Sequence, residues 1–196
     1  MAAEQTQVIL LVVRAFETLR IPYYLGGSRA SSVHGIYRAT AHADFVAAIR
    51  PHQAEPLAGL LQPAFYAEVE AIRAAVASSR SFNVIHLESM LKVDVFVAAT
   101  DPFSLMQFRR RTLQATTPDG QTTLYVASPE DTVLAKLRWY RAGGGVSDRQ
   151  WNDVLGVLKV QGASLDRAYL DEWARELSLT DLLRRALDDA GLPAEA

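Results

Sequence analysis

The sequence contains no cysteine, which excludes disulfide bridges, thiolate metal sites and cysteine nucleophiles. It also has no apolar run of the roughly 18 residues that a membrane-spanning helix needs. The apolar run Val8–Val13 is too short and is followed by Arg14. A positively charged N-terminal region with a cleavage site is missing as well. These absences predict a cytoplasmic protein with no membrane partner.

Strong net charge is also missing. The formal net charge of −2 argues against a protein that coats nucleic acid through bulk positive charge. The 196 residues are 49% hydrophobic and 21% charged, which is typical of one globular domain, or of one domain with a helical appendage. The acidic residues concentrate after position 150 and the basic ones between 101 and 150, so an anionic partner is expected to bind the middle of the chain.

The first two thirds of the chain mix helical and strand patterns, and this predicts an α/β (α+β) fold with a mixed sheet flanked by helices. Asp119-Gly120 supplies the positive φ angles of a tight hairpin turn. The expected helices cover 5–19, 28–34, 51–61 and 68–78, and the expected strands cover 23–25, 42–49, 82–87, 91–98, 112–117 and 122–126.

The pattern changes after Ser128. Ser128-Pro129-Glu130-Asp131 is typical of a helix start, with an N-cap, a proline in the first turn and acidic side chains near the positive end of the helix dipole. Four helices are expected over 129–141, 147–160, 166–178 and 180–190, separated by glycine and serine. We therefore expect an α/β lobe over 1–127 and a C-terminal helical lobe over 128–196.

Three short segments carry the candidate chemistry. Gly26-Gly27-Ser28 lies between a predicted strand and a predicted helix, where backbone N–H groups and the helix dipole favour phosphate. The next strand brings Asp44, with His42 on the same face because side chains two apart in a strand point the same way. A later apolar strand brings Asp94 beside Lys92. Carboxylates that share a face can hold Mg²⁺ together with nucleotide phosphates.

These segments resemble the signature of the nucleotidyltransferase superfamily, in which a Gly-Ser turn precedes an Asp-x-Asp pair and a third acid follows on a later strand. The helical part, with Lys136 and the run Ser147-Asp148-Arg149-Gln150 before Asp153, resembles minimal nucleotidyltransferases related to AbiEii-type toxins. The resemblance implies a nucleotidyltransferase-like fold, NTP as the substrate and Mg²⁺ or Mn²⁺ as the cofactor. It also implies an RNA, protein or small-molecule acceptor, and a cognate protein partner of toxin–antitoxin type.

The resemblance also assigns roles. Asp44 and Asp94 are expected to be catalytic metal ligands. The nucleotide is expected to contact the backbone of Gly26 and Gly27 and the side chains of Ser28, Arg29, Arg38, Lys136 and Arg149, with Asp153 orienting one of the last two. Arg149 and Asp153 are four residues apart on one helix, so they share a face.

His42 departs from the family pattern, because it stands where the family has the first acid of Asp-x-Asp. Imidazole is a poor Mg²⁺ ligand and a better ligand for Mn²⁺ or Zn²⁺. Three explanations stay open: His42 binds a softer metal, the protein binds nucleotide without turnover, or another acid supplies the missing ligand. Three functions also stay open for the protein as a whole: an NMP-transferring enzyme, a non-catalytic nucleotide-binding, RNA-binding or protein-binding module, and a pure interaction protein.

Overall fold

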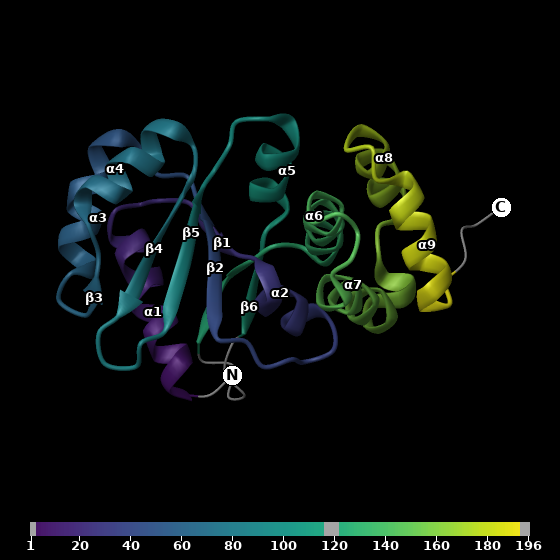
Figure 1. The fold of residues 1–196 in the computed structure, drawn as a ribbon, viewed down its shortest axis with the longest axis horizontal. Coiled ribbons are helices and arrows are strands. Elements are labelled where there is room, and N and C mark those ends of the chain that lie inside the picture. Colours follow the sequence, from purple (N-terminus) through teal and green to yellow (C-terminus); the bar gives the residue numbers. More distant parts are fainter. Residues whose placement is uncertain (1–2, 116–121, 193–196) are drawn as a thin grey trace. The chain divides into compact units, whose positions relative to one another are not determined.

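A computed structural model of the chain describes residues 3–115 and 122–192 (Figure 1). The chain divides into two compact units. The first consists of Met1–Gly26 and Ala39–Val126, and the second of Gly27–Arg38 and Ala127–Ala196. The segment 27–38, which the sequence placed in the N-terminal lobe, therefore packs with the C-terminal helices. The chain leaves the first unit directly after Gly26 and returns to it at Ala39.

The first unit is built on a seven-stranded mixed sheet in the described residues, with the order β3-β4-β5-β2-β1-β7-β6. The central strands β2 and β5 are parallel, whereas β4 runs antiparallel to β5 and β1 antiparallel to β2. The strands are β1 (Tyr23–Leu25), β2 (His42–Ala47), β3 (Phe65–Tyr66), β4 (Ser81–His86), β5 (Lys92–Val97), β6 (Thr112–Ala115) and β7 (Thr123–Val126).

The two faces of this sheet differ because apolar and polar residues alternate along its central strands. Phe45, Val84, Val93 and Val95 are buried on one face. The helices α1 (Ala3–Thr18), α3 (Ala54–Leu61) and α4 (Val69–Ser78) lie on one side of the sheet, and α5 (Pro102–Arg110) lies on the other (Figure 1). A short 3₁₀ turn, Pro51–Gln53, precedes α3.

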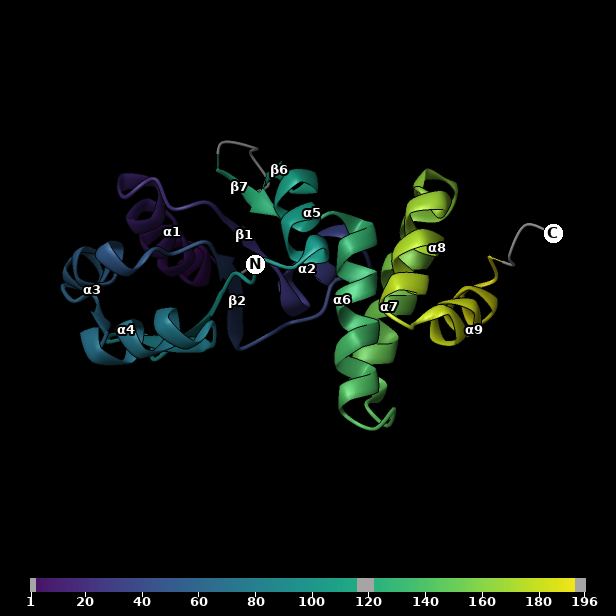
Figure 2. The same ribbon diagram turned by 90° about the horizontal axis from the view of Figure 1, so that it is seen from above.

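The second unit contains α2 (Gly27–His34), α6 (Pro129–Ala142), α7 (Asp148–Gln161), α8 (Arg167–Glu176) and α9 (Thr180–Ala190), with a 3₁₀ turn at Gly162–Ser164. Side-chain caps begin three of these helices, and the cap at Ser128 was expected from the sequence. Ser128 Oγ accepts from Asp131 N at 3.1 Å, Ser147 Oγ from Gln150 N at 3.4 Å, and Asp166 Oδ1 from Tyr169 N at 3.0 Å. Helices α6 and α7 lie side by side (Figure 2).

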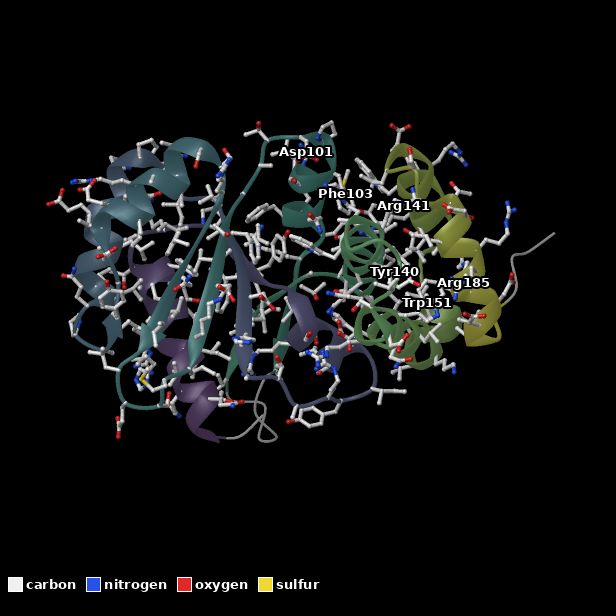
Figure 3. The ribbon with its side chains drawn as sticks, in the orientation of Figure 1. Asp101, Phe103, Tyr140, Arg141, Trp151 and Arg185 are labelled. Atoms are coloured by element: carbon white, nitrogen blue, oxygen red, sulfur yellow. The ribbon has the colours of Figure 1, made fainter. Side chains whose placement is uncertain are left out.

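Aromatic packing joins three helices of the second unit. The rings of Tyr140 on α6 and Trp151 on α7 have centroids 5.0 Å apart, and the Arg185 guanidinium on α9 lies 4.5 Å from the Trp151 ring centroid. Figure 3 shows these three side chains close together. Trp151 Nε1 also donates to Asp189 Oδ2 at 3.1 Å. Burial of the rings and the cation–π contact stabilise the α6–α7–α9 packing.

The predicted fold class is confirmed, and two elements were not predicted. Helix α5 is capped by Asp101, whose carboxylate accepts from Ser104 N at 3.1 Å, but its buried face rests on only Phe103 and Gln107, too few residues for a clear periodic pattern. Strand β3 has only two residues. The predicted Asp119-Gly120 turn lies outside the described residues. Within the described ranges, no helix has both the length and the apolar character needed to cross a bilayer.

Candidate functional site

Acidic side chains meet on the half-exposed face of the sheet in the first unit. Asp44 on β2 and Asp94 on β5 are direct register partners in a parallel pair, so their side chains share that face with strand backbones about 4.8 Å apart. Asn83 on β4 pairs with Asp94 from the other side. The row Asn83–Asp94–Asp44 thus crosses three strands. The neighbouring row is Ile85–Lys92–His42.

The carboxylate pair fits a divalent cation by its donor chemistry. Carboxylate oxygens are the protein ligands that Mg²⁺ prefers, and Mg²⁺ is commonly held by one or two carboxylates together with phosphates and water. In the part of the chain that the structure describes, no group of three or more His, Cys, Asp or Glu side chains is placed to hold a metal. A cation held by Asp44 and Asp94 would need phosphate and water to complete its coordination shell, and the assignment of Asp44, Asp94 and His42 as metal ligands stays a prediction.

Helix α5 limits how far the polar face extends. Tyr24, the register partner of Val46, donates from its hydroxyl to Gln107 Oε1 at 3.2 Å, and its ring centroid lies 5.0 Å from that of Phe108. Val46 follows Asp44 by two positions on the same face. The α5 contacts thus lie beyond the carboxylate row, toward the C-terminal end of β2.

The Asp94 carboxylate already has a cationic partner. Lys92 Nζ lies 2.8 Å from Asp94 Oδ1, and the two residues are separated by one position on β5. The side chains are 40% and 22% exposed respectively. Lys92 therefore neutralises one charge of the carboxylate pair from the same sheet face.

The two glycines in the turn after β1, Gly26 and Gly27, have different structural roles. Gly26 donates its N–H to the Asp44 carbonyl at 2.8 Å. This amide is therefore hydrogen-bonded to strand β2, whereas the sequence predicted an amide that points at a phosphate. Gly27 has a φ of +59°, a conformation that glycine adopts without steric cost. The turn thus requires glycine at position 27 to connect β1 to α2.

A buried polar cluster forms in the second unit around Asp153. We call Ser28, Arg38, Lys136 and Asp153 the Asp153 cluster. Lys136 Nζ lies 2.7 Å from Asp153 Oδ2, and Arg38 donates Nε to Oδ1 at 3.1 Å and Nη2 to Oδ2 at 3.2 Å. Ser28 Oγ accepts from Arg38 Nη2 at 2.8 Å and from Lys136 Nζ at 3.2 Å. The cluster joins α2, the following loop, α6 and α7, and carries one net positive charge.

Burial and charge act in opposite directions on Asp153. Its side chain is 7% exposed, that of Lys136 is 6% exposed and that of Arg38 is 35% exposed. Burial acts to raise the pKa of the Asp153 carboxyl, but the hydrogen bonds and charges of Arg38 and Lys136 outweigh it, so the pKa is lowered. Asp153 is therefore ionised at neutral pH and holds two cationic side chains in place.

The segment that carries Ser28 and Arg38 is attached to the helical unit at its middle. His34 Nε2 lies 2.6 Å from the Ala127 carbonyl oxygen, and Gln161 Nε2 donates to the His34 carbonyl at 2.6 Å. A Cβ on Gly35 would lie 2.6 Å from Val157 N, which shows that the loop backbone rests directly on α7. These contacts set the path of the loop that places Arg38 at Asp153.

Besides the two glycines, the predicted nucleotide-binding residues Arg29 and Arg149 lie outside the Asp153 cluster. Arg29 is only 3% exposed. Arg149 is exposed near the start of α7, and the structure gives it no hydrogen bond or ion pair with any described residue. Of the two cations that Asp153 was expected to orient, it contacts Lys136 and not Arg149. Arg149 and Asp153 are four residues apart on α7, as predicted, but the lysine that contacts Asp153 lies on α6.

The sequence interpretation missed two features of the site. It did not assign a role to the Lys92–Asp94 pair, although residues two apart on a strand share a face and an opposite-charge pair there is a readable signal. It also missed the close approach of Gly35 and Gly156, where a Cβ on Gly156 would lie 3.3 Å from Ile36 N. A glycine inside a predicted helix indicates such an approach, but its partner is distant in sequence.

The comparisons with known proteins identify the fold. No model of a protein family and no curated protein matches the chain. Among solved structures, an antigenic nucleotidyltransferase-like protein from Paracoccidioides brasiliensis is similar at 18% identity and a TM-score of 0.61, over 96% of this chain and 94% of that one.

Two structures of the antibiotic-resistance factor ANT(2'')-Ia are also similar. The solution structure has 11% identity and a TM-score of 0.58, over 94% of this chain and 99% of that one. The crystal structure in complex with adenylyl-2''-tobramycin has 12% identity and a TM-score of 0.57, over 88% of this chain and 97% of that one. At these identities the likeness concerns the fold. The chain therefore has a nucleotidyltransferase-like fold.

Proposed function

We propose that this protein binds a nucleoside triphosphate together with a divalent cation and transfers the nucleoside monophosphate to an acceptor. The observation that carries the proposal is the register pairing of Asp44 with Asp94 on one polar sheet face. Two carboxylates in that position, in a chain with this fold, match the chemistry that a metal–nucleotide substrate requires. The Asp153 cluster adds a second argument, since it holds a lysine and an arginine at the start of α2.

Each group has a distinct task in this proposal. Asp44 and Asp94 hold the cation, which when bound neutralises phosphate charge and orients the reacting oxygens. Lys136, Arg38 and Ser28 bind phosphate oxygens through their N–H and O–H groups. Asp153 does not contact the substrate but orients Lys136 and Arg38 through its carboxylate oxygens. An acceptor oxygen then forms a bond to the α-phosphorus while the bond to the leaving pyrophosphate breaks.

The acceptor is expected to be an RNA, a protein or a small molecule. The AbiEii resemblance favours RNA and a cognate protein partner. The complex of the similar ANT(2'')-Ia structure favours a small hydroxylated molecule such as tobramycin as a test acceptor. A transfer assay should therefore include all three classes, with the protein itself as one candidate acceptor.

The experiment uses purified protein, each α-labelled NTP, and Mg²⁺ or Mn²⁺, with tRNA, tobramycin or no added acceptor. We expect label transfer and pyrophosphate release in the wild type and loss of both in Asp44→Asn. The exposed Asp171→Asn on α8 is the matched control and should retain wild-type transfer. Absence of transfer to every acceptor with both metals would contradict the proposal.

A second function, nucleotide binding without transfer, is favoured by His42, which stands where the Asp-x-Asp pattern has its first acid. In the described residues, no group of three or more His, Cys, Asp or Glu side chains is placed to hold a metal. Calorimetric titration with ATP separates the two functions. Binding without turnover in the wild type, together with transfer activity gained in His42→Asp, would support the binding module. If His42→Asp changes neither metal binding nor transfer, His42 is not the cause of any missing turnover.

A further inference from the structure

We propose that Lys92 competes with the divalent cation for the Asp94 carboxylate, so that metal binds tightly only when a polyphosphate binds with it. The inference rests on the proposed function, which assigns Asp44 and Asp94 to the cation. It adds a role for a residue of this chain that the fold alone does not specify. Lys92 becomes a regulator of metal affinity within the site.

The geometry places the ammonium directly on a proposed metal ligand. Lys92 and Asp94 share one strand and one face, and Lys92 Nζ is 2.8 Å from Asp94 Oδ1. At that distance the two groups form an ion pair, which places a positive charge on a carboxylate oxygen that a cation would otherwise bind. In register, Lys92 pairs with His42, so its backbone lies one row away from Asp44, and its ammonium reaches Asp94 in the row of Asp44.

The charge balance follows from these positions. Two ionised carboxylates attract a divalent cation with two negative charges, and the Lys92 ammonium cancels one of them. The pair is partly exposed, with Lys92 at 40% and Asp94 at 22%, so solvent weakens the effect without removing it. An arriving polyphosphate supplies new oxygen partners to both the ammonium and the cation. Metal and nucleotide binding are thereby coupled.

The test is a Mn²⁺ titration followed by the EPR signal of free Mn²⁺, with and without a non-hydrolysable ATP analogue. Without nucleotide, we expect Lys92→Met to bind Mn²⁺ about tenfold more tightly than the wild type, because one repelling charge is lost. The analogue should improve Mn²⁺ affinity more in the wild type than in Lys92→Met. Lys159→Met, which removes an exposed lysine on α7, is the matched control and should behave as the wild type.

A double variant locates the effect. Adding Asp94→Asn to Lys92→Met should abolish the gain in Mn²⁺ affinity, and circular dichroism checks that each variant is folded. If Lys92→Met binds Mn²⁺ no more tightly than the wild type, while the wild type retains Mn²⁺ with the analogue, only the role of Lys92 is overturned. If neither protein retains Mn²⁺ under any condition, the metal assignment of the proposed function fails, and this inference fails with it.

Discussion

Asp153 on α7 and Lys136 on α6 form a buried ion pair with a separation of 2.7 Å, and both side chains are less than a tenth exposed. Burying two charges is costly unless each has well-placed partners. Arg38 and Ser28 provide those partners, so the pair is part of a fully connected polar cluster. In structural terms, the cluster ties α2 and its loop to the C-terminal helices.

Removing one side of this pair should destabilise the protein. We expect Asp153→Asn to lower the free energy of unfolding by about 3 kcal/mol, because Lys136 stays buried without its counter-charge. The loss should be smaller in the double variant Asp153→Asn/Lys136→Met, measured by urea denaturation. The exposed pair of Arg73 and Glu55 supplies the control, since Glu55→Gln should change stability very little. Equal effects of Asp153→Asn and Glu55→Gln would refute this account.

The close approach of Gly35 to α7 should tolerate no side chain. A Cβ at Gly35 would lie 2.6 Å from Val157 N and 2.7 Å from the Gly156 carbonyl carbon, both backbone atoms that cannot rotate away. We expect Gly35→Ala to cost about 2 kcal/mol through overpacking. Because the loop would shift, ATP affinity should fall as well.

The matched control for Gly35 lies in the other unit. Gly59 is on α3 and a Cβ there meets nothing within 4 Å. Gly59→Ala should therefore stabilise the protein by about 0.5–1 kcal/mol through helix propensity. Thermal melts of both variants, with calorimetric ATP titration, make the comparison. A Gly35→Ala protein as stable as Gly59→Ala would show that the loop does not depend on this contact.

His34 should make stability depend on pH. Burial lowers the pKa of the His34 imidazole below its ordinary 6.5, although its hydrogen bond with the Ala127 carbonyl acts in the opposite direction. The unfolded chain then binds more protons than the folded one between the two pKa values, so stability falls as pH drops below about 6.5. The slope from this residue is at most about 1.4 kcal/mol per pH unit.

The corresponding measurement compares urea denaturation of the wild type and His34→Gln between pH 7.5 and pH 5.5. Glutamine can still donate to the Ala127 carbonyl but does not titrate in this range. We expect a shallower pH dependence in the variant. Identical slopes in the two proteins would exclude His34 as the source.

The buried carboxylate of Asp131 depends on Tyr169. Asp131 is fully buried, and its Oδ1 accepts from the Tyr169 hydroxyl at 2.6 Å. We expect Tyr169→Phe to cost about 1.5–3 kcal/mol, the range for a hydrogen bond to a charged group. Tyr66, which is 57% exposed, is the control, and Tyr66→Phe should be nearly neutral in the same denaturation assay. Similar small effects for both variants would contradict the importance of this bond.

Much of the fold was predictable because its signals are local. The cap at Ser128 predicts the start of α6, and the short gap between the strands 82–87 and 91–98 predicts a hairpin that the structure contains. Helix α5 was missed because its buried face consists of only Phe103 and Gln107, too few residues for a clear periodic pattern. The grouping of 27–38 with the C-terminal helices was also missed, since it rests on contacts such as that of His34 with Ala127.

The candidate site, too, was predictable only in part. Asp44 and Asp94 were predicted to share a face, and their direct register pairing agrees with that prediction. The partners of Asp153 were not predictable in full. Helical spacing pointed to Arg149, whereas the observed contacts come from Lys136 on another helix and from Arg38 in a loop.

By itself, the sequence determined which residues can carry charge on a strand face or begin a helix, because side-chain alternation and capping depend on neighbours a few positions away. Only the tertiary structure decided which charges meet. Ion pairs such as Lys136 with Asp153 depend on how α6 packs against α7, and that packing is set by buried apolar contacts spread over the whole unit. Long-range partners therefore could not be assigned from local pattern.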